Sequence, residues 1–240
     1  MNKKVRLDRL LANLGYGSRK DVAYLIKNGL VTSDLGTHSS PSENVDAAAI
    51  NIMIDGEPLD PLPPLTLLVH KPIGYTCSHD EIGNLIFYLL PDRYRARSPQ
   101  LSPAGRLDKD SSGAVLLTDD GDFLHRIISP KHHVTKKYAV TLADPLRGDE
   151  TELFMSGTFC LKDDAKPLKP AFWQAIDDHH GIMHLTEGRY HQIRRMFGAV
   201  GNKVLTLHRE RIGQLELGDM PEGTFRIISQ NDIDLIFAKG

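Results

Sequence analysis

The sequence predicts an α+β protein in which a small helical N-terminal module precedes a larger domain built on a mainly antiparallel, mixed β-sheet. Two patterns predict this arrangement: helical spacing of apolar residues within positions 1–30, and strand-like runs beyond residue 65 that alternate irregularly with helical stretches. With 240 residues, of which 40% are hydrophobic and 25% charged, the chain has an ordinary globular composition and room for two unequal domains.

The N-terminal module is predicted to contain two short helices that pack on short strands. Gly15 and Gly17 end the first helix, Ser18 and Asp21 form a capping-box pattern that starts the second, and Gly29 ends it. The apolar faces of the two helices consist of Leu7, Leu10, Leu11 and Leu14, and of Val22, Leu25 and Ile26. The apolar stretches at 30–31 and 50–54 are expected to supply the strands.

Segment 58–64, PLDPLPP, contains four prolines in seven positions. Because proline fixes φ and lacks an N–H donor, this composition predicts a stiff, extended linker. We therefore expect a domain boundary here, with residues 1–60 in the first domain and residues 61–240 in the second. The alternative is an extended surface loop within a single domain.

Beyond the linker, apolar runs bounded by turn residues predict strands, and amphipathic patterns predict helices. The predicted strands are 65–70, 114–118, 136–142 and 181–186, and the predicted helices are 120–128, 149–156 and 190–200. The order of these elements is not a regular βαβ alternation. It therefore favours an α+β domain with helices flanking a mainly antiparallel mixed sheet.

Several classes of protein and site are excluded by what the sequence lacks. No apolar run approaches the ~20 residues of a membrane span, and no signal-peptide core follows the basic N-terminus. Two cysteines, Cys77 and Cys160, are too few for a disulfide scaffold or a paired-cysteine zinc site. The histidine pairs at 132–133 and 179–180 are poor chelates, and phosphate-loop and dinucleotide-binding motifs are absent. We expect a reduced, cytoplasmic monomer without cofactor, metal or membrane contact.

The formal net charge is −2, but basic residues gather in three segments. Residues 1–30 contain seven Lys and Arg against two Asp, residues 125–140 contain four and no acid, and residues 187–211 contain six against two Glu. Local basic patches attract phosphate backbones even when the total charge is near zero, so this layout favours a nucleic-acid partner. The alternative for each segment is a solvated surface.

The segment AGRLDKDSSG, residues 104–113, carries a candidate reactive carboxylate. Its glycines and serines indicate a tight loop just before the strand predicted at 114–118. A loop at a strand end is a usual position for a reactive side chain, and Asp108 occupies it with Arg106 two positions earlier. The alternative is an aspartate that only forms the turn.

The segment EGRYHQIRRMFGAVG, residues 187–201, is predicted to form a helix with one apolar face. At about 100° per residue, His191, Arg194 and Arg195 fall on the other side. A dense cationic group cannot be buried without partners, so it needs water, RNA phosphates or a carboxylate. The alternative for this segment is a basic helix whose charges face solvent. Tyr138, in the predicted strand KKYAV, is a further candidate for the site, and the alternative for it is a residue that only packs in the core or at its rim.

Four segments together resemble the RNA pseudouridine synthases of the small-ribosomal-subunit type. They are KPIGYTCS (71–78), AGRLDKDSSG (104–113), KKYAVTL (136–142) and EGRYHQIRRMFGAVG (187–201). The resemblance spans most of residues 65–213, and the GRLD and HQIR motifs in this order are specific to it. Residues 6–31, RLDRLLANLGYGSRKDVAYLIKNGLV, resemble an S4-type RNA-binding module. Residues 32–49 depart from the V-x-V-x-G pattern of that module.

The resemblance implies an enzyme that isomerises one uridine of small-subunit ribosomal RNA to pseudouridine after the base leaves its stack. It implies that Asp108 is the catalytic carboxylate, attacking C6 of the base or C1′ of the sugar. Arg194 is then the cationic partner, able to hold a carboxylate through two contacts, and Tyr138 stacks on the base.

Further RNA contacts follow from the resemblance and from the basic character of the side chains. Arg106 is expected either to fill the gap left by the everted nucleotide or to hold that nucleotide. Phosphate contacts are expected from Lys71, Arg189 and Arg195, and from Arg6, Arg9, Arg19, Lys20 and Lys27 in the S4-like module.

Three other functions remain open from the sequence. The basic patches fit a non-catalytic ribosomal-RNA-binding assembly factor equally well, although such a protein has no reason to aim a carboxylate at RNA. A sister synthase for large-subunit ribosomal RNA and an aspartate-nucleophile hydrolase are the others. The substrate could be naked RNA or an assembling ribonucleoprotein.

Overall fold

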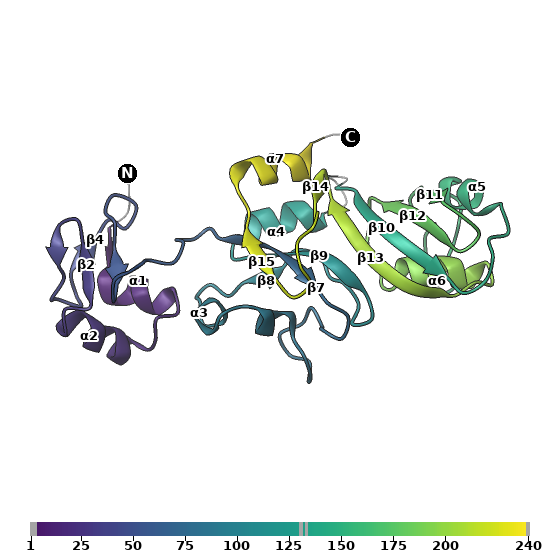
Figure 1. Cartoon of the computed structure of the whole chain (residues 1–240). Helices are drawn as coiled ribbons and strands as arrows, with labels where there is room; N and C mark the ends of the chain where they lie inside the picture. Colours follow the sequence, from purple (N-terminus) through teal and green to yellow (C-terminus); the bar gives the residue numbers. More distant parts are fainter. Residues whose placement is uncertain (1–3, 130–131, 133, 239–240) are drawn as a thin grey trace. The chain divides into compact units, whose positions relative to one another are not determined.

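The computed structural model describes residues 4–129, 132 and 134–238, which form two compact units (Figure 1). The first unit contains residues up to 66 together with residues 87–102 and 118–120. The second contains residues 67–86, 103–117 and those from 121 onward. The domain boundary at residue 60 stays a prediction. Segment 87–102, which follows the predicted boundary and was therefore expected in the second domain, belongs to the first compact unit.

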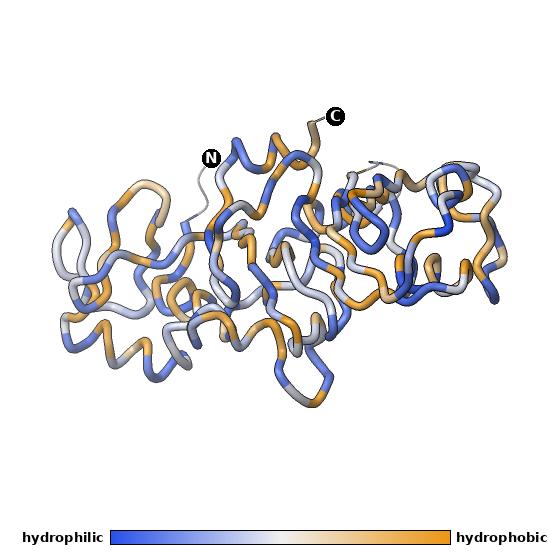
Figure 2. Tube along the Cα trace, turned by 45° about the vertical axis from the view of Figure 1, so that its right-hand side comes forward, coloured by the Kyte–Doolittle hydropathy of each residue, from blue (hydrophilic) through white to orange (hydrophobic). Residues whose placement is uncertain are grey.

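The first unit contains the two predicted helices, α1 (Leu7–Asn13) and α2 (Arg19–Lys27). The capping box is confirmed, because the Ser18 side chain accepts from the backbone N–H of Asp21 and the Asp21 carboxylate accepts from the backbone N–H of Ser18. The predicted leucines of α1 and Val22 and Ile26 of α2 are buried in one core. In Figure 2, α2 alternates between hydrophilic and hydrophobic along its length, as an amphipathic helix does.

Short strands complete this unit. They are β1 (Val5–Arg6), β2 (Val31–Ser33), β3 (Gly36–Thr37), β4 (Asn44–Val45), β5 (Met53–Ile54) and β6 (Glu57–Pro58). β1 pairs with β4, and the other four form a sheet in the order β3-β2-β5-β6. A further short helix, α3 (Asp92–Arg95), lies in segment 87–102.

The proline-rich segment is anchored to the first unit. The backbone N–H of Asp60 donates to the Tyr16 hydroxyl at 2.9 Å, and the Arg93 guanidinium holds the Asp60 carboxylate at 2.8 Å. Arg97 donates to the carbonyl of Pro61 at 2.9 Å. These contacts explain why segment 87–102 groups with the N-terminal residues, which local sequence patterns could not predict.

The second unit is built on a nine-stranded mixed sheet. The main order is β11 (Phe172–Ala175), β12 (His180–Leu185), β10 (Lys136–Leu142), β13 (Val204–Ile212), β9 (Ser112–Thr118), β7 (Thr66–Lys71) and β15 (Phe225–Ile227). β14 (Leu215–Glu216) pairs with β13, and β8 (Ser102–Pro103) pairs with β9. β13 runs antiparallel to β10 and parallel to β9, so it joins the two halves of the sheet.

The four strands predicted beyond the linker are confirmed as β7, β9, β10 and β12, within a few residues of their expected ends. The three predicted helices are confirmed as α4 (Gly121–Ile128), α5 (Glu150–Met155) and α6 (Gln192–Ala199). β13, the long strand on which the sheet depends, and the C-terminal helix α7 (Gln230–Phe237) were not predicted from the sequence.

Two groups of packed side chains position the helices of this unit. Phe123 and Ile127 of α4 and Ile236 of α7 belong to one buried cluster with residues of the central strands. At the opposite end of the sheet (Figure 1), Phe197 of α6 makes edge contacts with Phe154 of α5 and Trp173 of β11, with ring centroids 5.3 and 5.0 Å apart. The aromatic contacts fix α6 against the sheet and therefore fix the side chains at its N-terminus.

Gly113 allows β9 to lie directly beside β13. Its φ is 113°, a conformation that side-chain-bearing residues rarely adopt, and a Cβ at this position would lie 2.3 Å from the carbonyl oxygen of Arg209. A larger residue would therefore push apart the two strands that border the loop of Asp108.

Within the described part of the chain, no helix is long and apolar enough to span a bilayer.

Candidate active site

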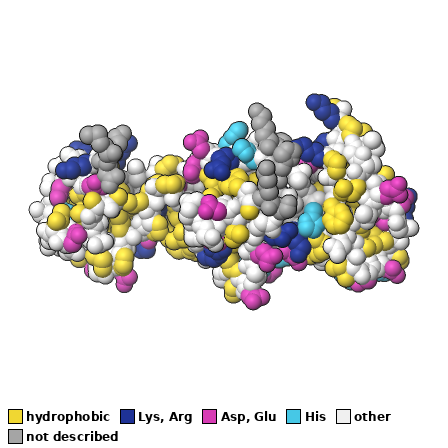
Figure 3. Space-filling view, turned by 90° about the horizontal axis from the view of Figure 1, so that it is seen from above, with side chains coloured by type: hydrophobic (Ala, Val, Ile, Leu, Met, Phe, Trp, Pro, Cys, Tyr) yellow, Lys and Arg dark blue, Asp and Glu magenta, His cyan; other side chains and the backbone are white. Residues whose placement is uncertain are grey.

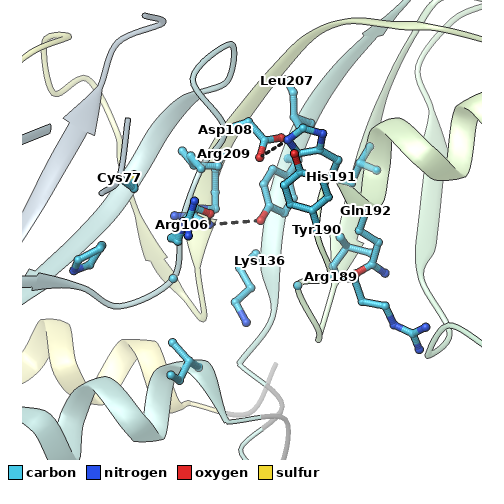
Figure 4. Close-up of a pocket in the computed structure, with 18 of the residues that line it drawn as sticks. Cys77, Arg106, Asp108, Lys136, Arg189, Tyr190, His191, Gln192, Leu207 and Arg209 are labelled. Atoms are coloured by element: carbon cyan, nitrogen blue, oxygen red, sulfur yellow. Dashed lines mark hydrogen bonds and ion pairs between the residues drawn. The ribbon is translucent and has the colours of Figure 1, made fainter. Parts of the chain in front are cut away.

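A pocket of about 770 Å³ opens in the second unit, within the size range of sites that enclose a small molecule or a single nucleotide. Its walls come from the loop before β9, strands β10 and β13, and the segment that leads into α6. Figure 4 shows Asp108, Tyr190 and His191 together at one side of this pocket and Lys136 pointing to another side. The pocket therefore collects residues from segments that are distant in the sequence.

Asp108 lies in the loop between β8 and β9, and its side chain is 26% exposed. The backbone N–H of Ser111 donates to the Asp108 carbonyl at 3.1 Å, which closes the tight turn that the glycines and serines predicted. One carboxylate oxygen lies 3.3 Å from His191 Nε2, and the other lies 3.9 Å from Arg194 Nε. The carboxylate thus faces the pocket with two cationic or protonatable groups beside it.

The structure brings Arg194 of α6 to Asp108, but not through two hydrogen bonds. Its Nη1 donates to the carbonyl of Val204 at 3.0 Å, and its Nη2 lies 3.2 Å from the carboxylate of Asp110. Only Nε faces Asp108, at a distance longer than a hydrogen bond. The expectation of a two-contact grip on Asp108 is therefore wrong, because the ends of the guanidinium tie the Asp108 loop to β13.

Tyr138 of β10 lines the pocket and is buried except for a small part of its surface. Its hydroxyl accepts a hydrogen bond of 3.3 Å from Nη1 of Arg209, a residue that is only 3% exposed. Arg209 also donates through Nε to the carbonyl of Ala114 at 2.6 Å. Because Arg209 donates to Tyr138, the phenolic proton remains available for an acceptor in the pocket.

Lys71 does not occupy the position expected for a phosphate contact. It is 0% exposed, and its ammonium donates to the carbonyls of Pro72 and Tyr75 at 2.9 and 2.7 Å. Burial lowers the pKa of this lysine. The structure contradicts its assignment as a phosphate contact, since the ammonium stabilises the bend after β7 and does not reach solvent.

Arg189 and Arg195 are held by a shared carboxylate, that of Asp164. Arg189 Nη1 lies 2.8 Å from one oxygen, and Arg195 Nη2 lies 2.6 Å from the other. Hydrogen bonds to these two guanidinium groups lower the pKa of Asp164. In Figure 4 the Arg189 side chain points away from Asp108. Both arginines are therefore engaged within the protein, whereas the Arg106 side chain is largely exposed at the pocket and lies 3.8 Å from Glu81.

The cations predicted in the N-terminal module are more accessible. Arg9 of α1 and Arg19, Lys20 and Lys27 of α2 are all exposed. Arg6 lies on β1, and its guanidinium makes two hydrogen bonds to Asp8, which lower the pKa of that carboxyl. Figure 3 shows basic and acidic side chains interspersed on the face it presents. RNA binding would therefore depend on local groups and not on one large field.

His191 was predicted from the sequence only as a member of a cationic group, without a place beside Asp108, and the pocket residues Arg209 and Lys136 were not predicted. His191 has a left-handed backbone, with φ 47°, at the residue before α6. Burial, with smaller contributions from Arg209 and Lys169, lowers the pKa of Lys136 to about 8. The basic residue two positions before Tyr138 was a signal that could have identified Lys136, because alternate strand residues share a face.

The described residues contain no cluster of His, Cys, Asp and Glu that could hold a metal ion. The groups that meet in the pocket are a carboxylate, a phenol, a histidine and several cations. Such a set can deliver a carboxylate nucleophile or base, hold a planar ring and bind the phosphates that flank it.

Comparisons with known proteins show to which family the chain is similar. Residues 66–199 match the family described as RNA pseudouridylate synthase. The chain is 40% identical over 231 residues to the ribosomal small subunit pseudouridine synthase A of Pasteurella multocida (strain Pm70), covering 95% of this chain and 98% of that protein. It is 38% identical over 238 residues to the protein of the same name from Escherichia coli (strain K12), with coverages of 95% and 98%. A crystal structure of a pseudouridylate synthase, 36% identical, has a TM-score of 0.68 and covers 97% of this chain and 99% of that chain.

Proposed function

The chain belongs to the RNA pseudouridine synthase family, within the type called ribosomal small subunit pseudouridine synthase A, and from that premise we propose that it isomerises a uridine of small-subunit ribosomal RNA with Asp108 as the catalytic carboxylate. The substrate follows the names of the relatives from Pasteurella multocida and Escherichia coli. The assignment of Asp108 rests on its place in the pocket.

The reaction needs no external reactant. The bond between N1 of uracil and C1′ of ribose breaks, the base turns, and a bond forms between C5 and C1′. C5 loses a proton and N1 gains one, so the atoms of the product equal those of the substrate. The protein must therefore supply a nucleophile or base, a means of holding the turning ring, and a path for one proton.

The observation that carries the proposal is the position of the Asp108 carboxylate at the pocket wall, partly exposed and flanked by His191 and Arg194. A carboxylate exposed in this way can reach C6 of the base or C1′ of the sugar as a nucleophile. Tyr138, on β10, offers its ring to the base and its hydroxyl proton to an acceptor. A base that stays enclosed in the pocket after its bond to ribose breaks favours rejoining over hydrolysis.

The RNA reaches this pocket only if the uridine leaves its stack, which costs a few kcal/mol. Arg106, exposed at the pocket, is the side chain that we assign to the vacated position. The S4-like N-terminal module would anchor the RNA through its exposed cations, either on naked RNA or on an assembling small subunit. Two tethered sites of modest affinity bind together more tightly than either alone.

Mapping of pseudouridine in purified ribosomal RNA tests the proposal. Small-subunit and large-subunit RNA transcripts are incubated separately with the protein. Because pseudouridine has the same mass as uridine, each modified position is labelled with a carbodiimide selective for pseudouridine before it is identified by mass spectrometry. We expect one new pseudouridine in the small-subunit transcript and none in the large-subunit transcript. Modification of the large-subunit RNA alone would overturn the substrate assignment, and release of free uracil would overturn the reaction.

A further inference from the structure

Tyr190 and His191 form a stacked pair at the wall of the pocket. Their ring centroids are 3.8 Å apart and their planes differ by 17°. Figure 4 shows the two rings face to face, with His191 next to Asp108. Tyr190 is 75% exposed, which is unusual for a large aromatic residue that lines a cavity. The pair therefore presents one aromatic face to whatever enters the pocket.

The segment that carries this pair is rigid. The backbone N–H of Arg189 donates to Gln192 Oε1 at 2.9 Å, and the Gln192 amide donates to Glu187 at the same distance. The Arg189 guanidinium is fixed in turn by Asp164. Tyr190 is thus held outward by a frame of hydrogen bonds on both sides of it in the sequence, and its exposure is not the result of a loose loop.

The backbone of His191 is held in an uncommon conformation. Its φ of 47° and ψ of 35° lie in the left-handed region, which non-glycine residues seldom adopt. Such conformations cluster at functional sites, where the surrounding structure holds them. Here the conformation turns the His191 ring between the Tyr190 ring and the Asp108 carboxylate.

We propose that the outer face of Tyr190 is a stacking subsite for an unpaired RNA base that adjoins the everted uridine. This inference rests on the proposed function, because it takes Asp108 to mark the position of the target nucleotide. His191 separates that position from Tyr190 by one ring, so a base on Tyr190 belongs to a neighbouring nucleotide of the same strand. Proteins recognise unpaired bases by stacking them on exposed aromatic rings, which an aromatic face next to a cationic pocket provides.

The stacking subsite can be separated from a structural role by three variants of the full chain. Tyr190→Ala removes the ring, Tyr190→Phe keeps it, and Phe172→Ala removes another exposed ring that also lies beside a histidine but does not line the pocket. The probe is a small-subunit RNA fragment in which 2-aminopurine replaces each nucleotide beside the modified uridine in turn. Stacking of the probe base quenches its fluorescence.

We expect quenching with the wild type, Tyr190→Phe and Phe172→Ala at one flanking position, and none with Tyr190→Ala. Loss of one stacked base should weaken the Kd of Tyr190→Ala about tenfold, while Tyr190→Phe stays within about twofold. Unchanged Kd and fluorescence in Tyr190→Ala, or equal losses in Phe172→Ala, would overturn the subsite.

Turnover by the wild type distinguishes failure of this inference from failure of the proposed function. If the wild type forms pseudouridine and Tyr190→Ala behaves like it in binding, only the stacking subsite is wrong. If the wild type forms none in the fragment, either naked or assembled with small-subunit ribosomal proteins, the substrate assignment has failed. The same variants are then compared on a single-stranded oligouridine that carries one 2-aminopurine, where equal quenching in wild type and Tyr190→Ala overturns the subsite as well.

Discussion

The cations of the N-terminal module and those around the pocket differ in what surrounds them, although both groups look alike as basic residues in the sequence. Arg9, Arg19, Lys20 and Lys27 are exposed on α1 and α2. Around the pocket, by contrast, Arg194 and Arg209 donate to backbone carbonyls and face acidic or phenolic side chains. The first group is therefore exposed to RNA phosphates, while the second positions the groups to which we assign the reaction.

The groups that contact a basic side chain therefore decide its function more than its charge does. Substitutions in the pocket should lower the rate at saturating RNA, and substitutions in the N-terminal module should weaken binding. Substitutions of Arg189 or Arg195 should lower stability, since these residues share Asp164. Single and combined substitutions can test whether these three groups of cations affect rate, RNA binding and stability separately.

Among substitutions of the cations, the largest effect is expected from Arg194→Met. Without the guanidinium, Asp108 loses a neighbouring cation and the loop loses its tie to β13. We expect kcat to fall about a hundredfold, with RNA affinity within about threefold of wild type. Arg194→Lys restores the charge without the same hydrogen-bonding fork and should recover part of the rate. If Arg194→Met lowered kcat and RNA affinity by equal factors, Arg194 would be assigned to the cations that bind phosphates.

The next effect is expected from replacing Arg9, Arg19, Lys20 and Lys27 together by glutamine. Because each phosphate contact contributes about 0.7 to the slope of log Kd against log salt for single strands, the slope should fall by about three. Kd at moderate salt should rise about tenfold or more, and kcat at saturating RNA should not change. A salt dependence like that of the wild type would show that these residues do not bind RNA.

A smaller, pH-dependent effect is expected from Lys136. Its pKa of about 8 means that the ammonium is charged in the pocket at pH 7 and mostly neutral at pH 9. RNA affinity should therefore fall a few-fold as the pH rises from 7 to 9, and Lys136→Arg, which stays charged, should remove that fall. A wild type whose Kd is constant over this range would exclude Lys136 from the RNA contacts.

Lys136 should also make the free energy of unfolding depend on pH. This free energy should rise with pH, whereas RNA affinity should fall. The pKa of Lys136 is depressed in the folded protein, from 10.5 to about 8, so the unfolded chain binds more protons between these values. Stability then rises with pH across that window, and the increment is absent below it. Lys136→Met should remove this rise and should be more stable than wild type at pH 7. Thermal unfolding at pH 7 and pH 9 measures both.

The smallest effect on RNA binding is expected from Arg195→Gln. The substitution removes one of the two guanidinium partners of Asp164 and should lower Tm by a few degrees. RNA affinity measured well below Tm should stay within about twofold of wild type. Lys20→Gln is the matched control, since Lys20 is exposed and should weaken binding without lowering Tm.

Local patterns were sufficient for much of the fold. The Ser18–Asp21 capping box and the apolar strands β7 and β9 follow from residues close together in the chain, and they formed as expected. β13 was missed because its sequence, VLTLHRERI, alternates apolar and charged residues only in part. Its role depends on pairing with β9, whose partner residue Ser112 lies 96 positions from His208.

The candidate site was predictable where a motif names the residue and not where partners decide the role. Asp108, Tyr138 and Arg194 belong to motifs, and the first two line one pocket while Arg194 stands behind Asp108. Lys71 was misassigned because a lysine at a strand end gives no sign that its ammonium will bind two carbonyls. The left-handed backbone of His191 likewise arises from contacts that the sequence does not reveal.

The most direct test of the catalytic carboxylate compares wild type and Asp108→Asn on the same RNA, measuring the single-turnover rate of pseudouridine formation and the Kd. Asparagine keeps the size of the side chain and removes the negative charge, so the variant should bind RNA at least as tightly as wild type. We predict a variant that binds and forms no detectable pseudouridine. Pseudouridine formation at the wild-type rate would contradict the assignment of Asp108, and with it the role given to the pocket.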